Sequence, residues 1–424
     1  MNHFWIIVTL LFAVAACSTD DDWYNEDWTL STTTTSSDDD NSTTTSTASN
    51  VVSGVTSEGD VTSFGIAFNK NAISESAKVD SEDDDYIENT TFAKTITITF
   101  STSGAATVSG DDEGIVNING NDVIATNNGS KIIKYVLTGE TKDGFFKLYS
   151  SKKQAIVLNG VSITNPDGAA INNQSKKRTF IVLNDGSKNY LTDGTNYNDA
   201  TESEDMKGCF FSEGQLIFSG KGYLEVDANC KAGIRSDDYV RFMPGVNVYV
   251  DASDGNGVRG KDAITVTGGV INVNITGTAN KGFSSDGAVQ FDGGRTTIIT
   301  SGGYEWDEDD NDYSACAGVK ADSLFRMNGG ALLCKSSGIG GKGISCDDVV
   351  EINGGEISII TTGKKYSKGS ASVSPKGIKG DGDMVIKGGK VLVRATGGEG
   401  SEGIESKGAL TISGGTVACW CYDD

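Results

Sequence analysis

The hexapeptide Gly343-Ile344-Ser345-Cys346-Asp347-Asp348 is one copy of a phrase that occurs seven times in the second half of this 424-residue chain. The phrase glycines stand at positions 233, 257, 282, 318, 343, 377 and 403, with steps of 24, 25, 36, 25, 34 and 26 residues. Gly-Gly pairs beginning at 268, 293, 329, 354, 388 and 414 repeat the last five of these steps, and each precedes an alternating strand such as Val270–Ile275. Two markers with one uneven spacing indicate a repeat of about 25 residues, the length of one turn of a parallel β-helix.

Composition favours short strands joined by tight turns. The chain has 55 glycines and 3 prolines, and glycine supplies the positive φ that tight turns need while it weakens helix interiors. In each phrase the residue after glycine is large and apolar, and the residue two further on is small, as in Ile344 and Cys346. Because side chains alternate along a strand, both positions are expected to face inward. We therefore expect an all-β protein whose body is a parallel β-helix, a solenoid.

The N-terminus predicts export and lipidation. Residues Phe4–Ala16 form an apolar run too short to span a bilayer as a lasting helix, as in a signal peptide. The run ends in Val14-Ala15-Ala16-Cys17, which resembles the lipobox of bacterial lipoproteins, so residues 1–17 are expected to be a lipoprotein signal peptide with Cys17 lipidated. Asp20–Asp22 are similar to the acidic tags of surface-exposed lipoproteins. The expected location is therefore the outer membrane, at the cell surface.

The rest of the chain divides into three parts. Residues 18–55 are rich in Ser, Thr and Asp and are expected to be a disordered tether, because too few apolar side chains are present to offset the entropy of ordering. Residues 56–134 are expected to form a β-rich N-terminal cap, and residues 135–424 the β-helix. The two long steps of the repeat hold insertions, Tyr304–Tyr313 and Lys364–Lys368, which are expected as loops on one flank, where solenoids build binding surfaces.

Charge and residue inventory exclude several functions. The formal net charge of −23 disfavours nucleic acid and anionic membrane surfaces, so membrane contact is expected through the lipid anchor only. The single histidine, His3, lies in the export signal, which excludes a histidine base, a histidine-bound metal and a Ser-His-Asp triad from the mature chain. Seven cysteines follow Cys17, an odd number, and Cys316 with Cys334 is the disulfide to consider first. We expect a monomer.

One outward column of the coil is acidic. Four residues after the phrase glycine stand Asp237, Lys261, Asp286, Asp322, Asp347, Asp381 and Lys407. Rungs stack about 4.8 Å apart, and carboxylates at that distance repel by roughly 3 kcal/mol at an effective dielectric near 20. Two ways of neutralising the column remain open. One is ion pairing with the outward residues two positions earlier, Arg235, Arg259, Lys320 and Lys379. The other is calcium held by oxygens of several rungs, which Asp238, Asp262 and Asp348 favour locally because no basic residue matches them.

Aromatic residues of the first insertion are candidates for sugar contact. Exposed rings stack on the apolar faces of pyranoses, and Tyr304, Trp306 and Tyr313 lie together in an acidic stretch. An equal alternative is that Trp306 only pins the loop to the solenoid. Signals for catalysis are weak, because the many lysines and arginines single out no base for a lyase and the aspartate column offers many carboxylate pairs by accident.

The upstream rungs carry a family resemblance. The strings Tyr135-Val-Leu-Thr-Gly139, Val157-Leu-Asn-Gly-Val-Ser-Ile-Thr164 and Leu191-Thr-Asp-Gly194, with the later phrases, resemble the exported carbohydrate-binding domain-containing β-helix family over roughly residues 110 to 421. The resemblance implies a right-handed parallel β-helix, similar in shape to pectate lyases, that binds cellulose or acidic pectic glycans with Ca2+ at acidic turns. The implied metal ligands are Asp237, Asp238, Asp262, Asp286, Asp322, Asp347, Asp348 and Asp381.

The chain departs from this family at the residue before each phrase glycine. Where the family often has Asp, this chain has Ala232, Asn256, Lys281, Ala317, Lys342, Lys376 and Glu402. The change removes carboxylates from one column, and Lys281, Lys342 and Lys376 are expected to contact uronates of an acidic glycan. We therefore expect a non-catalytic polysaccharide-binding protein assisted by calcium. The alternatives are a calcium-dependent polysaccharide lyase and an adhesin-like surface scaffold.

Overall fold

The computed structural model describes residues 64–423 apart from 74, 76–77, 199–203 and 310, and before residue 64 only the backbone of three strands. These are β1 (Asn2–Thr9), β2 (Ser31–Thr32) and β3 (Ser46–Thr47); β1 runs antiparallel to β41 (Thr416–Asp423), and β2 to β3. Cys17 and nearly all of the expected tether lie outside the described residues, so export and lipidation stay predictions. In the described part of the chain no helix is long and apolar enough to cross a membrane.

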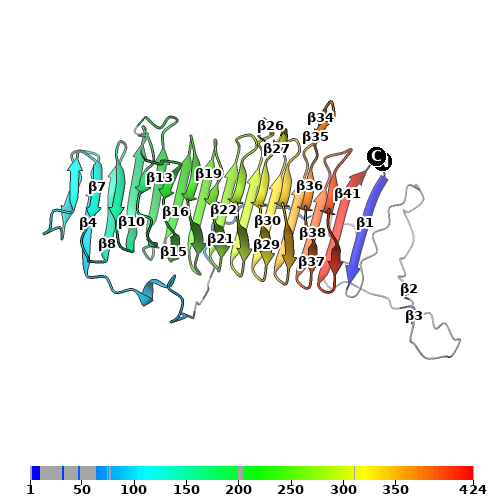
Figure 1. Cartoon of the computed structure of the whole chain (residues 1–424), viewed down its shortest axis with the longest axis horizontal. Coiled ribbons are helices and arrows are strands. Elements are labelled where there is room, and N and C mark those ends of the chain that lie inside the picture. Colours follow the sequence, from blue (N-terminus) through cyan, green and yellow to red (C-terminus); the bar gives the residue numbers. More distant parts are fainter. Residues whose placement is uncertain are drawn as a thin grey trace.

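Most strands lie in three stacks along one long coil (Figure 1). Stack 1 contains β4 (Lys94–Phe100), β8 (Ile133–Thr141), β10 (Gln154–Asn165), β12 (Thr179–Leu183), β15 (Leu216–Gly220), β18 (Tyr239–Phe242), β21 (Ala263–Val266), β24 (Ala288–Phe291), β29 (Leu324–Met327), β32 (Val349–Ile352), β37 (Met384–Ile386) and β40 (Leu410–Ile412). Stack 2 contains the second half of β10, then β13 (Lys188–Asp193), β16 (Tyr223–Ala228), β19 (Asn247–Ala252), β22 (Val270–Ile275), β25 (Arg295–Thr300), β30 (Ala331–Ser336), β33 (Glu356–Thr361), β38 (Lys390–Ala395) and β41. Stack 3 contains β7 (Asp122–Asn127), β9 (Phe145–Ser150), β11 (Ile171–Asn173), β14 (Gly208–Ser212), β17 (Ala232–Ser236), β20 (Val258–Gly260), β23 (Lys281–Ser285), β28 (Ala317–Ala321), β31 (Lys342–Cys346), β36 (Lys376–Gly380) and β39 (Glu402–Ser406).

Neighbouring rungs pair in parallel in all three stacks, as in β17 with β20 and β19 with β22. Stacks 1 and 2 join into one sheet because β10 pairs with β12 through its first half and with β13 through its second half. The expected all-β architecture of parallel sheets is confirmed, and its winding is consistent with a β-helix. The right-handed course stays a prediction.

The N-terminal end is closed by antiparallel strands. β5 (Thr107–Ser109) pairs with β4, and β6 (Val116–Asn119) with β7, whereas β4 and β7 already pair in parallel with the next rung. Within residues 64–134, apart from the undescribed positions, the first strand of the cap is β4, which begins at Lys94. The coil itself therefore starts before residue 135, because β4 and β7 share the register of the rungs that follow.

The interior is one continuous core from Ile96 to Cys419. The predicted inward positions of the phrase are confirmed: Ile344 is fully buried, and so is Cys346. Phenylalanines form a ladder through the middle rungs, where the rings of Phe218 and Phe242 stack at 5.1 Å between centroids and those of Phe283 and Phe291 at 5.9 Å. The expected Cys316–Cys334 disulfide is wrong, since both are free buried thiols; Cys316 instead donates from Sγ to the carbonyl of Gly277 at 3.2 Å.

The phrase glycines are required by close approach between stacks. A Cβ added at Gly343 would lie 2.4 Å from Cγ2 of Ile359 in stack 2 and 2.6 Å from the carbonyl oxygen of Gly377 on the next rung. None of the seven phrase glycines has a positive φ, in contrast to the second glycine of the Gly-Gly pairs, such as Gly355 with φ of 76°. The two repeated motifs therefore use glycine for different reasons: one needs space and the other needs a left-handed turn.

This distinction predicts that Gly343→Ala destabilises the protein by about 1–3 kcal/mol through overpacking. Gly303→Ala is the matched control, because nothing lies within 4 Å of a Cβ built there and its φ is not positive. Urea unfolding followed by far-UV circular dichroism measures both. Equal stability of Gly343→Ala and wild type would contradict the close-approach explanation.

Residues 64–93 form a strap along the outside of stacks 1 and 2, running from the C-terminal rungs back to the cap. Phe64 packs against Leu392 and Ala418, and Phe68 meets Tyr249 edge-on at 5.5 Å. The strap ends at the short 3-10 helix η1 (Ile87–Asn89), beside which Phe92 packs on Phe180. The sequence predicted this segment as part of a β-rich cap, but it lacks strand periodicity, and its described residues form no strand.

Acidic side chains fasten the strap. A carboxylate oxygen of Glu75 accepts hydrogen bonds from the backbone N–H groups of Gly245 at 3.1 Å and Gly269 at 2.5 Å. Asp85, which is 7% exposed, accepts from Nε of Arg178 at 2.7 Å and from Nη1 of Arg241 at 3.0 Å. The strap therefore neutralises arginines that project from two separate rungs.

We expect Asp85→Asn to destabilise the protein by about 3 kcal/mol, because the half-buried guanidinium groups of Arg178 and Arg241 both lose a carboxylate partner. Asp84→Asn is the control, since its side chain is 72% exposed and touches Arg178 only at 3.4 Å; its expected cost is below about 1 kcal/mol. Thermal unfolding measures the difference, and limited proteolysis tests whether the strap detaches first. Two variants of equal stability would show that the buried pairs do not hold the strap.

Candidate functional site

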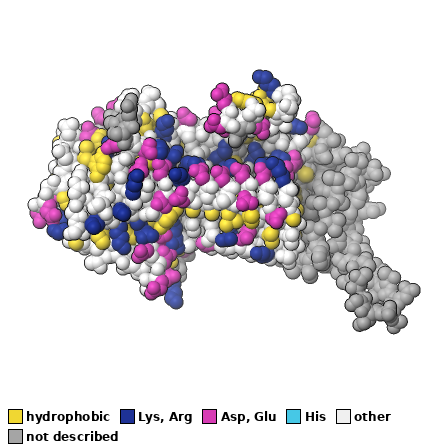
Figure 2. All heavy atoms as spheres, viewed as in Figure 1, with side chains coloured by type: hydrophobic (Ala, Val, Ile, Leu, Met, Phe, Trp, Pro, Cys, Tyr) yellow, Lys and Arg dark blue, Asp and Glu magenta, His cyan; other side chains and the backbone are white. Residues whose placement is uncertain are grey.

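The outward face of stack 3 carries the acidic column. Figure 2 shows rows of acidic and basic side chains running along the molecule below projecting loops. Arg235 and Lys207 both pair with Asp237, at 3.2 and 2.7 Å. The other ion pairs are Arg259–Asp286, Lys320 with Asp322 and Asp347, and Lys379 and Lys407 with Asp381. Ion pairs therefore involve five aspartates of the column. Arg235, Arg259, Lys320 and Lys379 are the partners that the sequence suggested, whereas Lys207 and Lys407 were not predicted as partners.

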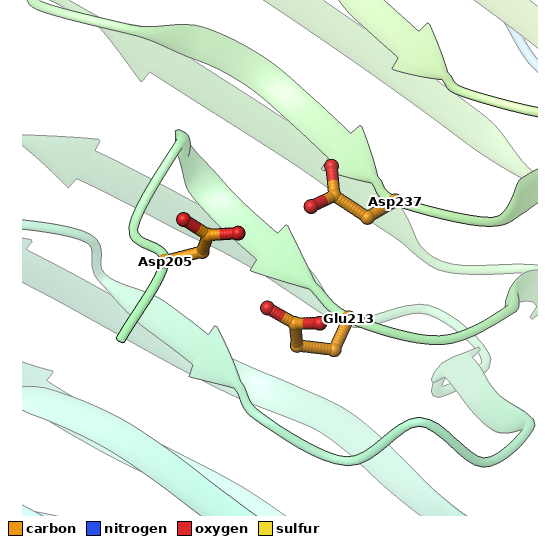
Figure 3. Close-up of side chains that lie close together, drawn as sticks. All are labelled: Asp205, Glu213 and Asp237. Carbon is orange, nitrogen blue, oxygen red and sulfur yellow. The ribbon is translucent and has the colours of Figure 1, made fainter. Parts of the chain in front are cut away.

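Lys207 also occupies the one acidic cluster that the described residues form. Asp205 in the loop before β14, Glu213 directly after β14 and Asp237 directly after β17 point toward one another, with carboxylate oxygens within 4.8 Å (Figure 3). Nζ of Lys207 bonds to both Asp205 and Asp237. Burial together with Asp237 and Asp205 raises the pKa of Glu213. The ammonium stands in the place of a cation, so these carboxylates do not fit an additional metal.

The carboxylates directly after the acidic column in sequence suit calcium better than the column itself. Among the described residues, Asp238, Asp262 and Asp348 have no basic partner within ion-pair distance. Asp238 and Asp262 lie on adjacent rungs, joined by the hydrogen bond from N of Asp262 to O of Asp238 at 3.0 Å. Burial and the nearby charge of Asp262 raise the pKa of Asp238. Two uncompensated carboxylates beside backbone carbonyls are the chemistry that Ca2+ takes.

Two hairpins project above this face. The first insertion forms β26 (Tyr304–Asp307) and β27 (Asp312–Ala315), and the second forms β34 (Tyr366–Lys368) and β35 (Ala371–Val373). Their aromatic rings join the two: Tyr304 stacks on Tyr366 at 4.3 Å, and Tyr313 meets Tyr366 edge-on at 5.2 Å. Trp306 contacts Tyr313 at 4.9 Å and stays 42% exposed. The sequence missed Tyr366, although it lies in the insertion already assigned to the same flank.

The three predicted lysines differ in their surroundings. Lys281 donates from Nζ to the carbonyl of Ala315 at 2.9 Å and to Oγ of Ser314 at 3.1 Å, at the base of the first hairpin. Lys376 pairs with Glu402 at 2.7 Å and Glu405 at 2.5 Å. These two lysines are engaged within the protein.

Lys342 lies between them along the coil, in register with Lys376 and with Ala317. Burial, followed by the charges of Lys281, Lys379 and Lys376, lowers the pKa of Lys342 to about 8. No acceptor for its Nζ exists among the described residues. Lys342 is thus the member of the predicted set that has no partner of its own.

A third insertion, between β13 and β14, borders the same face and rests on a buried carboxylate. Asp193 is 3% exposed, and it accepts hydrogen bonds from the hydroxyl of Tyr197 at 2.6 Å and the N–H of Asn229 at 2.5 Å. Burial raises the pKa of Asp193 to about 6, despite these hydrogen bonds. The neutral acid is therefore favoured in the folded protein below about pH 6.

This raised pKa predicts a pH dependence of stability. Between the ordinary value of 3.8 and about 6 the folded state holds a proton that the unfolded chain releases, so stability falls as pH rises through this window. Asp193→Asn is expected to remove this fall. Urea unfolding of both proteins from pH 4 to pH 7 measures it, with pH as the only variable. A constant difference between the two curves would contradict the assignment.

The geometry defines an all-β protein of long parallel sheets, consistent with a β-helix, with two hairpins that project at one edge of the coil. The chain belongs to the family described as carbohydrate-binding domain-containing protein, whose model matches residues 119–279 and 339–424, more than half of its length. It is similar to a carbohydrate-binding domain-containing protein of Acetivibrio thermocellus, with 33% identity over 122 residues, 28% of this chain and 42% of that protein. The chain thus spans less than half the length of that relative.

Among solved structures, the chain is similar to one titled polysaccharide lyase-like protein from C. thermocellum, a gadolinium derivative. The identity is 26% and the TM-score 0.49, and the match covers 62% of this chain and 96% of that one.

Proposed function

We propose that this protein binds polysaccharide without catalysis, along the outer face of stack 3, while anchored to the cell surface through Cys17. Membership of a carbohydrate-binding family supports a polysaccharide ligand. The observation that carries the proposal is the aromatic pair of hairpins, which presents the exposed ring of Trp306 beside a continuous parallel sheet. An extended glycan chain can lie along such a sheet and stack one sugar on the indole.

The ligand class we propose is a plant-type glycan, cellulose or an acidic pectic chain, and the proposed solenoid is right-handed like that of pectate lyases. Calcium is proposed at the turns of Asp238 and Asp262, where it would neutralise two stacked carboxylates and stiffen the adjacent rungs. Asp237, Asp286, Asp322, Asp347 and Asp381 are less suited to it, because lysine and arginine already neutralise them.

The proposal predicts that Trp306→Ala weakens glycan binding about tenfold, from the loss of one stacking contact. Tyr190→Ala is the matched control, because Tyr190 is equally exposed, at 40%, but lies in stack 2. Affinity electrophoresis against soluble cellulose derivatives and polygalacturonate measures retardation. Retardation of neither glycan would leave the adhesin-like scaffold as the remaining function.

The calcium part is tested in the same gels with EDTA. The double variant Asp238→Asn, Asp262→Asn is expected to lose both EDTA sensitivity and thermal stabilisation by calcium, whereas Asp322→Asn is expected to keep both. If the two variants show the same EDTA sensitivity and the same thermal stabilisation by calcium, calcium does not bind at Asp238 and Asp262.

A calcium-dependent lyase is the second candidate, favoured by one observation. Burial lowers the pKa of Lys342, and also that of Lys281, to about 8, a value suited to a general base. Polygalacturonate incubated with the protein and calcium separates the two functions. Rising ultraviolet absorbance from unsaturated products would establish the lyase.

A further inference from the structure

The two hairpins form an arch over one rung of stack 3. β26–β27 project before β28 and β34–β35 before β36, and they lie side by side at the edge of the coil (Figure 1). The rung between them, β31, has only a short turn, against which Val373 of the second hairpin packs at Gly340. The stacked rings of Tyr304 and Tyr366 close the arch.

Lys342, the first residue of β31, is in register with Ala317 and Lys376, the first residues of the two strands that follow the hairpins, and so lies at the base of the arch. Every neighbouring lysine has an acceptor. Lys281 uses the carbonyl of Ala315, Lys376 uses Glu402, Lys379 uses Asp381, and Lys320 uses Asp322 and Asp347. Within the described residues, Nζ of Lys342 has none.

The charges that face Lys342 are mostly of its own sign. β23 contributes Lys281, and β36 contributes Lys376 and Lys379, while Asp312 of β27 is the acidic group that opposes them. Lys342 is half-buried, and an ammonium among like charges without an acceptor of its own is favourably placed to pair with an anion supplied from outside.

Resting on the proposed glycan binding, we propose that Lys342 receives a single anionic group of the ligand, a carboxylate or a sulfate ester, at the base of the arch. No covalent bond forms. Where the amine is neutral, it takes one proton from solvent as the anion enters, and the product is an ammonium–anion pair. Lys281 and Lys376 keep their contacts within the protein. The three predicted lysines therefore have different roles: Lys342 binds the ligand, and the other two stabilise the fold.

The test is an NMR titration of protein carrying 13C at the lysine ε-carbons, with the Lys342 signal identified by its loss in Lys342→Met. The probes are sodium galacturonate and sodium sulfate, compared with galactose and with sodium chloride of equal ionic strength. We expect galacturonate to raise the pKa of Lys342 from about 8 toward the ordinary 10.5, with Lys281 unchanged. An equal effect of sulfate extends the site to sulfate esters. No change beyond that in sodium chloride overturns the proposal.

Binding to whole glycans gives a second readout. Lys342→Met is expected to weaken polygalacturonate binding about tenfold and to leave neutral cellulose derivatives unaffected. Lys364→Met is the control, because Lys364 is exposed beside the second hairpin. If both variants bind polygalacturonate like wild type, the role of Lys342 fails while the proposed function stands. If wild type binds no glycan, the proposed function fails and the titration alone decides Lys342.

Discussion

The close approach between stack 3 and stack 2 is the constraint on which the rest of the structure depends. Each phrase glycine lies where even one methyl group would collide with a stack 2 side chain, as Gly377 does with Val393. At these glycines the backbone of stack 3 therefore contacts the side chains of stack 2 directly. The large apolar residue after each glycine fills the rest of the interior. Interiors are close-packed, so this fit fixes both the cross-section of the coil and the length of each repeat.

Because the interior is fixed by repetition, variation is confined to the outside. Insertions leave the coil at the turn between stacks 2 and 3, where they disturb no inward position. Two of them lean together through Tyr304 and Tyr366, although the rings are 62 residues apart in sequence. The pair of hairpins thereby places a projecting cluster of aromatic rings at one point along the coil.

The outer charges are mostly satisfied within the protein. Lysine and arginine neutralise the acidic column, and the strap supplies Asp85 to Arg178 and Arg241. Surface ion pairs contribute little stability singly, but here they remove the repulsion that stacking would otherwise impose at every rung. Among the described residues, the outward carboxylates of Asp238, Asp262 and Asp348 have no basic partner, and the amine of Lys342 has no acceptor. We propose that a cation partners the first two carboxylates and that an anionic group of the ligand partners the amine.

The sequence by itself determined the repeat, its inward residues and the flank that carries the insertions, because each of these follows from a period of about 25 residues and an alternation of two. It named Arg235, Arg259, Lys320 and Lys379 as possible partners of the aspartates but left ion pairing and calcium both open. It did not determine the strap, since residues 64–93 follow no period and are ordered only by contacts with distant rungs. It could not separate Lys342 from Lys281 and Lys376 either, because all three hold the same repeat position. Only the tertiary structure decided that, by placing hairpin carbonyls against Lys281 and glutamates against Lys376 while leaving Lys342 at the base of the arch. Electrostatic surroundings depend on residues far apart in the chain, and a repeat pattern carries no information about them.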